Sequence, residues 1–352
     1  MSIDTLWYTR CPAPTAASIA IREGWLEREF ANDGIAVKSL ASARDTSVHQ
    51  SHYNHSQPNS FRFGGYVPPL VSASRGADLR VIGLSWPDRT AAVLALPESN
   101  LRSPADLRGA RLSVPKRRND SIDWWRALVL AGYESALQVA GLKLVDVQLV
   151  EIGIDRPYMA DATVGQAAGQ SLWGARSQFA VQREEIAALL RGEVDVIYSD
   201  AAMGEIVKAM FGLVSVVDLT APEETGDVFM AQPLVLTATG SLVEQRPDLV
   251  ARWIRRLLDA DAWAREHEAR VLQIIAQDTG LPEDFVRGAY SSRIHQQLDV
   301  SLTPLRLSLL EAKCAELHRW GFIERPLDVR ELVDSAPLEM ALSARALAQG
   351  DR

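Results

Sequence analysis

Apolar residues recur along the first two thirds of the chain as short runs of strand length, separated by turn residues and by stretches of mixed polarity. Strands are predicted at residues 6–9, 35–37, 79–85, 91–96, 111–114, 145–152, 194–198, 214–219 and 233–239. Between them, apolar side chains recur with the period of a helix face and predict helices at 15–30, 70–75, 122–140 and 183–191. Strands that alternate with helices indicate an α/β fold.

Three intervening segments carry turn or loop signals. In Ser103–Gly109, a serine cap, a first-turn proline, an acid at the capping-box position and a final glycine predict a short helix. Gly64-Gly65 with Pro68-Pro69 predicts a turn before the helix at 70–75. The stretch 153–178 predicts a loop whose length is typical of functional loops.

Beyond Ser241 the pattern changes to helix alone. Pro247 opens a long helix whose apolar positions trace one face, and further helices are predicted at 271–276, 305–320 and 330–333. The chain is therefore predicted to be an α/β protein with a helical C-terminal part. The polar segment 41–63 shows no period and predicts irregular structure or short helical turns.

Composition adds limits on the kind of partner. With 352 residues, of which 47% are hydrophobic and 23% charged, the chain is long enough for two domains or one large one. The net charge of −8 argues against nucleic acid or an anionic membrane as partner, and leaves room for a local basic cleft that binds a small anion. The N-terminal MSIDTLWYTR lacks the pattern of a secretion signal, so we expect a cytoplasmic protein. We also expect a monomer.

The chain has two cysteines, too few for a disulfide framework and without zinc-site spacing. Cys314 shares a helical face with Leu310 and Leu317, which predicts a core position. Cys11 follows a β-type run and precedes two prolines and a helical pattern. A cysteine between a strand and a helix N-terminus is favoured as a thiolate by free N–H groups and by the helix dipole. The alternative for Cys11 is a small buried apolar residue.

Histidines and aromatic residues offer further candidates. His49, His52 and His55 have a spacing that could bring imidazoles together on a helix, but no cysteine or clear carboxylate partner accompanies them, so we predict no metal site. An aromatic pocket could be lined by some of Trp124, Trp125, Tyr133, Trp173 and Phe179, although each is by default a core residue.

Several motifs together resemble one family. They are YTRCPAP, the spaced QPxxxRFGGxxPPL of residues 57–70, SPADLRGARLSV and GEVDVIYS. In combination they resemble the 2'-hydroxybiphenyl-2-sulfinate desulfinases of bacterial dibenzothiophene desulfurisation. The cysteine turn and RFGG are the specific parts, whereas the other two motifs are common to the wider superfamily of solute-binding proteins for sulfonates and thiamine precursors.

The resemblance implies a two-domain fold of the periplasmic-binding-protein type (type II), crossed twice by the chain, with the ligand in the cleft. The implied division places residues 1–97 and 220–352 in domain I, which carries Cys11 and Arg62, and residues 98–219 in domain II. A desulfinase of this family hydrolyses the carbon–sulfur bond of an aromatic sulfinate to sulfite and needs no cofactor.

The resemblance also assigns site residues. It implies that Cys11 is the catalytic cysteine, that Arg62 binds the sulfinate, and that a backbone N–H of Gly64-Gly65, nearer to Gly65, faces a substrate oxygen. A count without gaps places the family's histidine at His52. His49 keeps a local Ser-Val-His context and stays open as an alternative, as does His55.

Asp200 departs from the family's pattern, because it stands where aromatic and apolar residues are usual. That departure puts the biphenyl substrate in question. Two other kinds of protein remain as rivals: a solute-binding protein that captures a small aromatic or sulfonated ligand without chemistry, and a protein like the thiamine-pyrimidine synthases. The second lacks support because no cysteine-rich iron motif is present.

Overall fold

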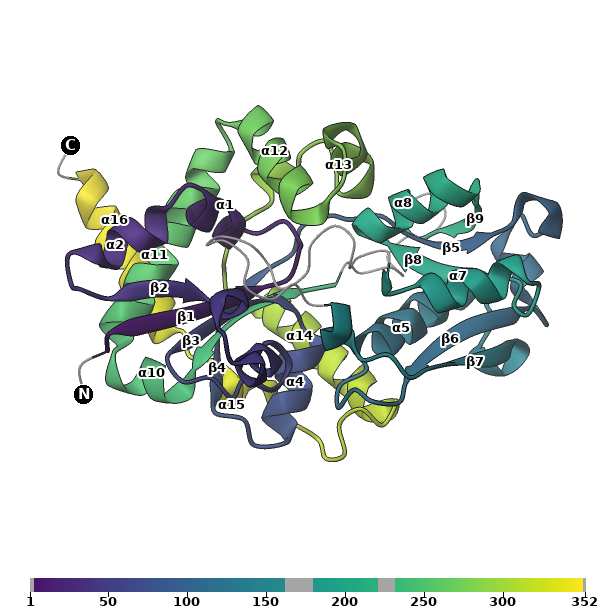
Figure 1. Cartoon of the computed structure of the whole chain (residues 1–352), viewed down its shortest axis with the longest axis horizontal. Helices are drawn as coiled ribbons and strands as arrows, with labels where there is room; N and C mark the ends of the chain where they lie inside the picture. Colours follow the sequence, from purple (N-terminus) through teal and green to yellow (C-terminus); the bar gives the residue numbers. More distant parts are fainter. Residues whose placement is uncertain (1–2, 162–179, 221–231, 351–352) are drawn as a thin grey trace.

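The computed structural model describes residues 3–161, 180–220 and 232–350. Its strands form two groups that lie next to each other along the long axis of the molecule, and helices cover both (Figure 1). Among the described helices, none is long and apolar enough to cross a membrane.

The first group is a five-stranded sheet in the order β2-β1-β3-β10-β4. Its strands are β1 (Thr5–Arg10), β2 (Ala36–Ser39), β3 (Ser60–Gly65), β4 (Leu79–Ser85) and β10 (Leu234–Thr239). β1 runs parallel to β2 and β3, while β10 is antiparallel to β3 and β4. The near-continuous apolar run of β4 reflects burial on both faces of the sheet.

Helices around this sheet come from both ends of the chain. They are α1 (Ala16–Arg22), α2 (Trp25–Ala31), α3 (Ser51–Asn54), α4 (Val67–Ser74), α10 (Gly240–Gln245), α11 (Pro247–Ala264), α12 (Glu268–Thr279), α13 (Glu283–Ala289) and α16 (Ala336–Gly350). The apolar face of α11 packs on the sheet, where Trp253 stacks on Phe61 of β3 with ring centroids 4.1 Å apart. The long C-terminal helices therefore complete the core of the N-terminal sheet.

The second group joins a three-stranded sheet, β8-β5-β9, to the pair β6-β7 through a bridge between Leu112 and Val196. Its strands are β5 (Ala91–Ala95), β6 (Arg111–Arg117), β7 (Gln148–Ile154), β8 (Ile197–Asp200) and β9 (Val214–Asp218). Its helices are α5 (Trp124–Val139), α7 (Arg183–Leu190) and α8 (Ala201–Phe211). The 3₁₀ helices of the chain are η1 (Leu40–Ser42), η2 (Thr46–Gln50), η3 (Pro97–Ser99), η4 (Pro104–Leu107), η5 (Leu144–Asp146), η6 (Tyr158–Asp161) and η7 (Ile294–Gln296).

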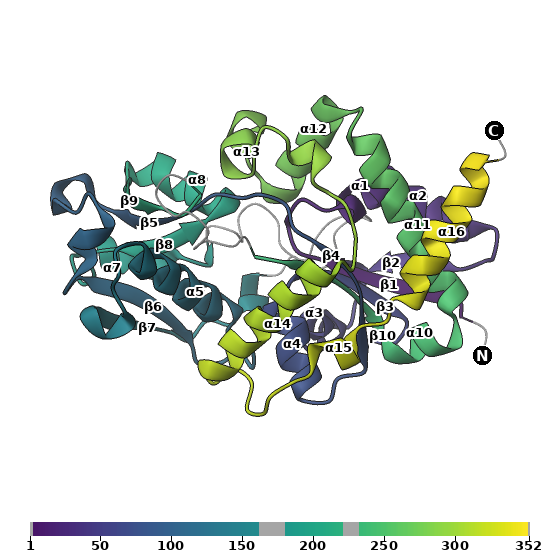
Figure 2. The same cartoon turned by 180° about the vertical axis from the view of Figure 1, so that it is seen from behind.

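The chain crosses between the groups after β4, since β5 pairs with β8 and β9. The crossing thus lies between Ser85 and Ala91, and the predicted boundary at residue 97 stays a prediction. Helix α14 (Pro304–Arg319), followed by α15 (Val329–Leu332), spans both groups (Figure 2). Ser301 before it bonds to Leu84 of β4, and Arg319 at its end pairs with Glu134 of α5 at 2.5 Å.

Most predicted elements are confirmed, and the others need correction. The helix predicted at 15–30 is two helices, because Gly24 adopts the left-handed conformation with φ 67° between them. Gly64-Gly65 is the end of strand β3 and not a turn, since both glycines pair with β10. Helices α8, α10, α13 and α16 were not predicted, and residues 60–63 of the segment predicted to be irregular belong to strand β3. The segment 103–109 contains η4 with its capping box, and the loop predicted at 153–178 lies largely outside the described residues.

Candidate active site

The site is built on the paired strands β1 and β3. Thr9 is the register partner of Arg62, and the Cys11 N–H continues the pairing by donating to the Phe63 carbonyl at 3.0 Å. Because alternate residues of a strand face the same side, Thr9 and Cys11 lie on one face, next to Arg62 and Gly64 of β3. Arg10 between them points to the other face.

Cys11 lies at the end of β1, as predicted, but not at a helix N-terminus. Helix α1 begins only at Ala16 and is capped by Thr15, whose hydroxyl accepts from the Ser18 N–H at 3.2 Å. The surroundings of the thiol are therefore set by tertiary neighbours. Its Sγ lies 3.7 Å from His52 Nε2 and 3.9 Å from Arg62 Nη2.

The two glycines of β3 have different surroundings. A Cβ on Gly64 would lie 2.3 Å from Cys11 Sγ, so only glycine leaves room for the thiol here. A Cβ on Gly65 would meet no atom of the described residues within 4 Å, and Gly65 lines the pocket in front of Cys11. Gly64 thus leaves room for the thiol, and Gly65 presents open backbone to the pocket.

His52 is held by contacts at both ring nitrogens. Its Nδ1 lies 2.7 Å from Thr9 Oγ1, and its Nε2 faces Cys11. Burial, then the positive charge of Arg62, then His55 hold the pKa of His52 well below its usual 6.5, so the ring is neutral near pH 7. A neutral imidazole beside a thiol can accept a hydrogen bond from it, whereas burial and the Arg62 charge oppose full protonation of the ring.

Arg62 is buried, and backbone carbonyls fix its orientation. Its Nε donates to the His52 carbonyl at 2.7 Å, and its Nη1 donates to the Gly65 carbonyl at 3.0 Å. A guanidinium has five N–H groups, so hydrogens on Nη1 and Nη2 remain beyond these two bonds. Burial lowers the pKa of Arg62, and the neighbouring Cys11 raises it.

The other two histidines are turned away from Cys11. His49 Nε2 lies 3.1 Å from the Ala43 carbonyl, and His55 Nδ1 lies 3.2 Å from the Tyr53 carbonyl. The structure therefore brings His52, and neither alternative, to Cys11. The three imidazoles form no metal site, and no cluster of three or more His, Cys, Asp or Glu side chains within the described parts of the chain could hold a metal ion.

A pocket opens in front of Cys11 between the two strand groups, and aromatic rings line much of it. They are Tyr53, Tyr66, Trp124, Trp125, Tyr158 and Tyr290. Trp124 and Trp125 were among the sequence candidates, whereas Tyr133 packs outside the pocket against Tyr198, and Trp173 and Phe179 lie outside the described residues.

Sequence reasoning missed the four pocket tyrosines. Tyr53 and Tyr66 directly follow His52 and Gly65, so proximity to the family motifs could have indicated them. Tyr158 belongs to the stretch that was singled out as a functional loop. No local signal marks Tyr290, which reaches the pocket from the residue after α13.

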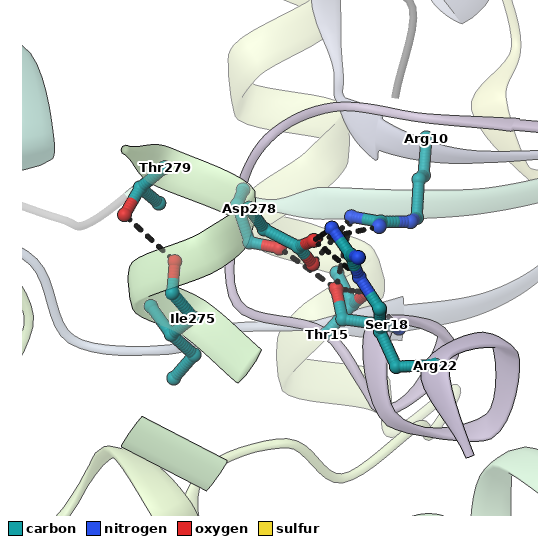
Figure 3. Close-up of polar contacts among 8 residues, drawn as sticks. Arg10, Thr15, Ser18, Arg22, Ile275, Asp278 and Thr279 are labelled. Carbon is teal, nitrogen blue, oxygen red and sulfur yellow. Dashed lines mark hydrogen bonds and ion pairs between the residues drawn. The ribbon is translucent and has the colours of Figure 1, made fainter. Parts of the chain in front are cut away.

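A buried ion cluster on the opposite face fixes the end of β1 (Figure 3). Arg10 donates to Asp278 of α12 through Nη1 at 2.6 Å and Nη2 at 2.8 Å, and Arg22 of α1 donates to the same carboxylate at 2.7 Å. Arg10 and the Asp278 side chain are only 1% and 2% exposed. Since Arg10 adjoins Cys11, this cluster positions the thiol from behind.

Comparisons with known proteins define the class and then the family. No family model matches the chain. Its fold is that of the periplasmic binding proteins: the structure matches the periplasmic aliphatic sulphonate binding protein of Escherichia coli with a TM-score of 0.63 at 18% identity, over 95% of this chain and 93% of that one.

A curated 2'-hydroxybiphenyl-2-sulfinate desulfinase of Rhodococcus erythropolis is 30% identical over 346 residues, 92% of this chain and 90% of the relative. A crystal structure of a cysteine-to-serine mutant of the desulfurization enzyme DSZB, in complex with biphenyl-2-sulfinic acid, matches with a TM-score of 0.78 at 26% identity, over 97% of this chain and 100% of that one. The chain belongs to the family of 2'-hydroxybiphenyl-2-sulfinate desulfinases.

Proposed function

We propose that this protein is a desulfinase that hydrolyses the carbon–sulfur bond of an aromatic sulfinate, in the cytoplasm and without a cofactor. The observation that carries the proposal is the position of Cys11, with its thiol between His52 and Arg62 in a pocket lined with aromatic rings. The family relationship supports it, as does the match to an enzyme solved with an aryl sulfinic acid.

Arg62 is the proposed anion site. A sulfinate is a monoanion with two oxygens, and the free N–H groups on Nη1 and Nη2 can donate to both in parallel. The Gly65 N–H is proposed to donate to a substrate oxygen as in an oxyanion hole. Because the Arg62 guanidinium is already fixed by two backbone carbonyls, it loses little freedom when it binds the anion.

The reaction consumes one water: ArSO₂⁻ + H₂O gives ArH + HSO₃⁻. In one route, His52 takes the Cys11 proton and the thiolate attacks sulfur; the arene leaves as its carbon takes up a proton, and water releases bisulfite from the cysteine. In the other route, the Cys11 thiol protonates the ring carbon, SO₂ departs and water converts it to bisulfite, and the thiolate regains a proton. The routes differ in whether sulfur becomes bonded to Cys11.

The test is sulfite release from 2'-hydroxybiphenyl-2-sulfinate and from benzenesulfinate by the purified protein. Cys11→Ser is expected to lower turnover by at least about a thousandfold, as for other catalytic nucleophiles. Cys314→Ser is the matched control, because Cys314 is a buried residue of α14 outside the pocket. Mass spectrometry of the acid-quenched Cys11 peptide would distinguish the routes, since only thiolate attack leaves SO₂ on the cysteine.

The rival function, ligand capture without chemistry, predicts a different result. A solute-binding protein would bind the sulfinate stoichiometrically, raise its melting temperature and release no sulfite. Folded protein that binds but releases none would therefore overturn the desulfinase proposal.

A further inference from the structure

One corner of the pocket is polar. Tyr66 follows β3, Arg89 lies on the segment that crosses to β5, and Asp200 ends β8; all three line the same pocket as Cys11. We call these three residues the polar corner. Burial raises the pKa of both Tyr66 and Tyr290; the charges of Glu316, Arg89 and Asp200 follow as causes for Tyr66, and those of Arg89 and Asp200 for Tyr290.

The polar corner is buried and poorly satisfied. Tyr66 is 0% exposed, and its hydroxyl has no hydrogen-bond partner among the described residues, nor does the buried Nε of Arg89. Arg89 Nη2 lies 3.6 Å from Asp200 Oδ2, and the Tyr198 hydroxyl lies 3.5 Å from the same oxygen, so both contacts are long. A buried polar group without a hydrogen-bond partner lowers the stability of the folded protein. In the wall of a pocket, such a group can gain its missing hydrogen bond from a ligand.

Asp200 also gives up a local interaction. It occupies the N-cap position of α8, where an aspartate normally accepts from the first turn, yet its side chain makes no cap bond within the described structure. The carboxylate instead faces Arg89. The carboxylate oxygens of Asp200 are therefore available as hydrogen-bond acceptors beside Arg89 and are not used by the first turn of α8.

Charge and geometry indicate which substituent fits. The charges of Arg89 and Asp200 balance, and Glu316 of α14 adds a negative charge that acts on Tyr66, so the polar corner favours a neutral group over a second anion. A phenolic hydroxyl can donate to Asp200 and accept from Tyr66 or from Arg89 Nε. The aromatic rings beside it suit the ring that would carry such a hydroxyl.

We infer that Tyr66, Arg89 and Asp200 form a specificity site for a hydroxyl group on the aromatic substrate, separate from the sulfinate site at Arg62. The inference rests on the proposed function for the identity of the anionic end.

The experiment compares kcat/KM for biphenyl-2-sulfinate with kcat/KM for analogues that carry a hydroxyl at the 2', 3' or 4' position. The parent protein is expected to prefer one hydroxylated analogue by about tenfold or more, the value of one well-made hydrogen bond. Tyr66→Phe and the double variant Arg89→Met/Asp200→Leu are each expected to reduce that preference toward unity.

Stability separates recognition from a structural role. Because the Tyr66 hydroxyl has no partner in the described structure, Tyr66→Phe is expected to leave the melting temperature unchanged or raise it. Tyr133→Phe is the matched control, since Tyr133 bonds to Ser113 at 3.4 Å outside the pocket. It should lower stability and leave the preference intact.

A binding measurement keeps the two proposals distinguishable. Dissociation constants of the same ligands for Cys11→Ser should show the same preference, and this result does not require turnover. Absence of sulfite from every substrate, with the preference retained, would overturn the desulfinase and leave the specificity site standing. Equal binding of hydroxylated and plain ligands, or a preference that survives both sets of variants, would overturn the specificity site.

Discussion

Among single residues, Gly64 and Gly65 matter to the site because each leaves space where another residue would place a side chain. Gly64→Ala would place a methyl group 2.3 Å from Cys11 Sγ and 3.4 Å from Arg62 Nη2, so the thiol must move. We expect turnover to fall by about a hundredfold, because misplacement of a reacting group by about 1 Å has effects of that size. Sulfite release and the alkylation rate of Cys11 by iodoacetamide check this.

Gly65→Ala serves as the comparison for folding. Its Cβ would meet open space in the described structure, so we expect a melting temperature close to that of the parent. A Gly64→Ala protein that is as active as the parent would contradict the assigned seat of the thiol.

Buried neutral histidines also predict a dependence of stability on pH. Burial, followed by the charge of Arg62, lowers the pKa of His55 from 6.5 to about 3. Between pH 6.5 and about pH 3, His55 is protonated in the unfolded chain but not in the folded protein. The stabilisation of the folded protein that results from this difference is fully present above pH 6.5 and is lost as the pH falls toward 3. The loss is about 1.4 kcal/mol per pH unit for one such group.

His55→Asn removes this proton, and asparagine tolerates the left-handed conformation that His55 adopts with φ 56°. Urea unfolding at pH 7 and pH 5 should show a smaller loss of stability for the variant than for the parent, by about 2 kcal/mol. His52 is present in both proteins, and because His55 is the last of the three causes that lower the pKa of His52, the His52 contribution changes little. Identical losses would show that His55 is not held neutral by the fold.

At the scale of elements, Asp278 joins α12 to β1 and α1. The carboxylate accepts from Arg10 and Arg22, so Asp278→Ala would leave the Arg10 guanidinium, 1% exposed, without its ion pair. We expect a loss of about 3–5 kcal/mol in unfolding free energy, the size found when one partner of a buried pair is removed. Denaturant unfolding measures it.

A compensating variant tests the cause. Arg10→Met together with Asp278→Leu replaces the buried pair by apolar side chains, and Arg22, whose side chain is 22% exposed, can turn to solvent. This double variant should recover most of the lost stability. If it is as unstable as Asp278→Ala, the loss comes from packing and not from an unpaired charge.

At the scale of the whole molecule, the pocket takes residues from both strand groups, with Cys11 and Arg62 on one side and Trp124 and Asp200 on the other. A ligand that touches both walls stabilises the arrangement in which they are closer. We expect biphenyl-2-sulfinate to reduce the radius of gyration of the Cys11→Ser protein in small-angle X-ray scattering. An unchanged radius at saturating ligand would contradict closure.

Much of this fold could be predicted because the local order of apolar, polar and capping residues indicates the strands and helices. The period of apolar residues located most of the strands and the long helices, and the capping box of η4 was read directly from Ser103 and Asp106. The errors fall where pairing overrides local preference. The local sequence of Gly64-Gly65 predicts a turn. The two glycines are instead the end of a strand, because they pair with β10, which is remote in sequence.

The α/β class, the core position of Cys314, and the choice of Cys11 and Arg62 as candidates could all be predicted, because strand period, helix period and a family motif are local. Three features required the folded structure: which histidine meets Cys11, why Gly64 carries no side chain, and that Tyr66, Arg89 and Asp200 line one pocket. Each of these depends on distances between segments that are remote in sequence. Such distances are set by strand register and by the packing of the two strand groups, and no local pattern encodes them.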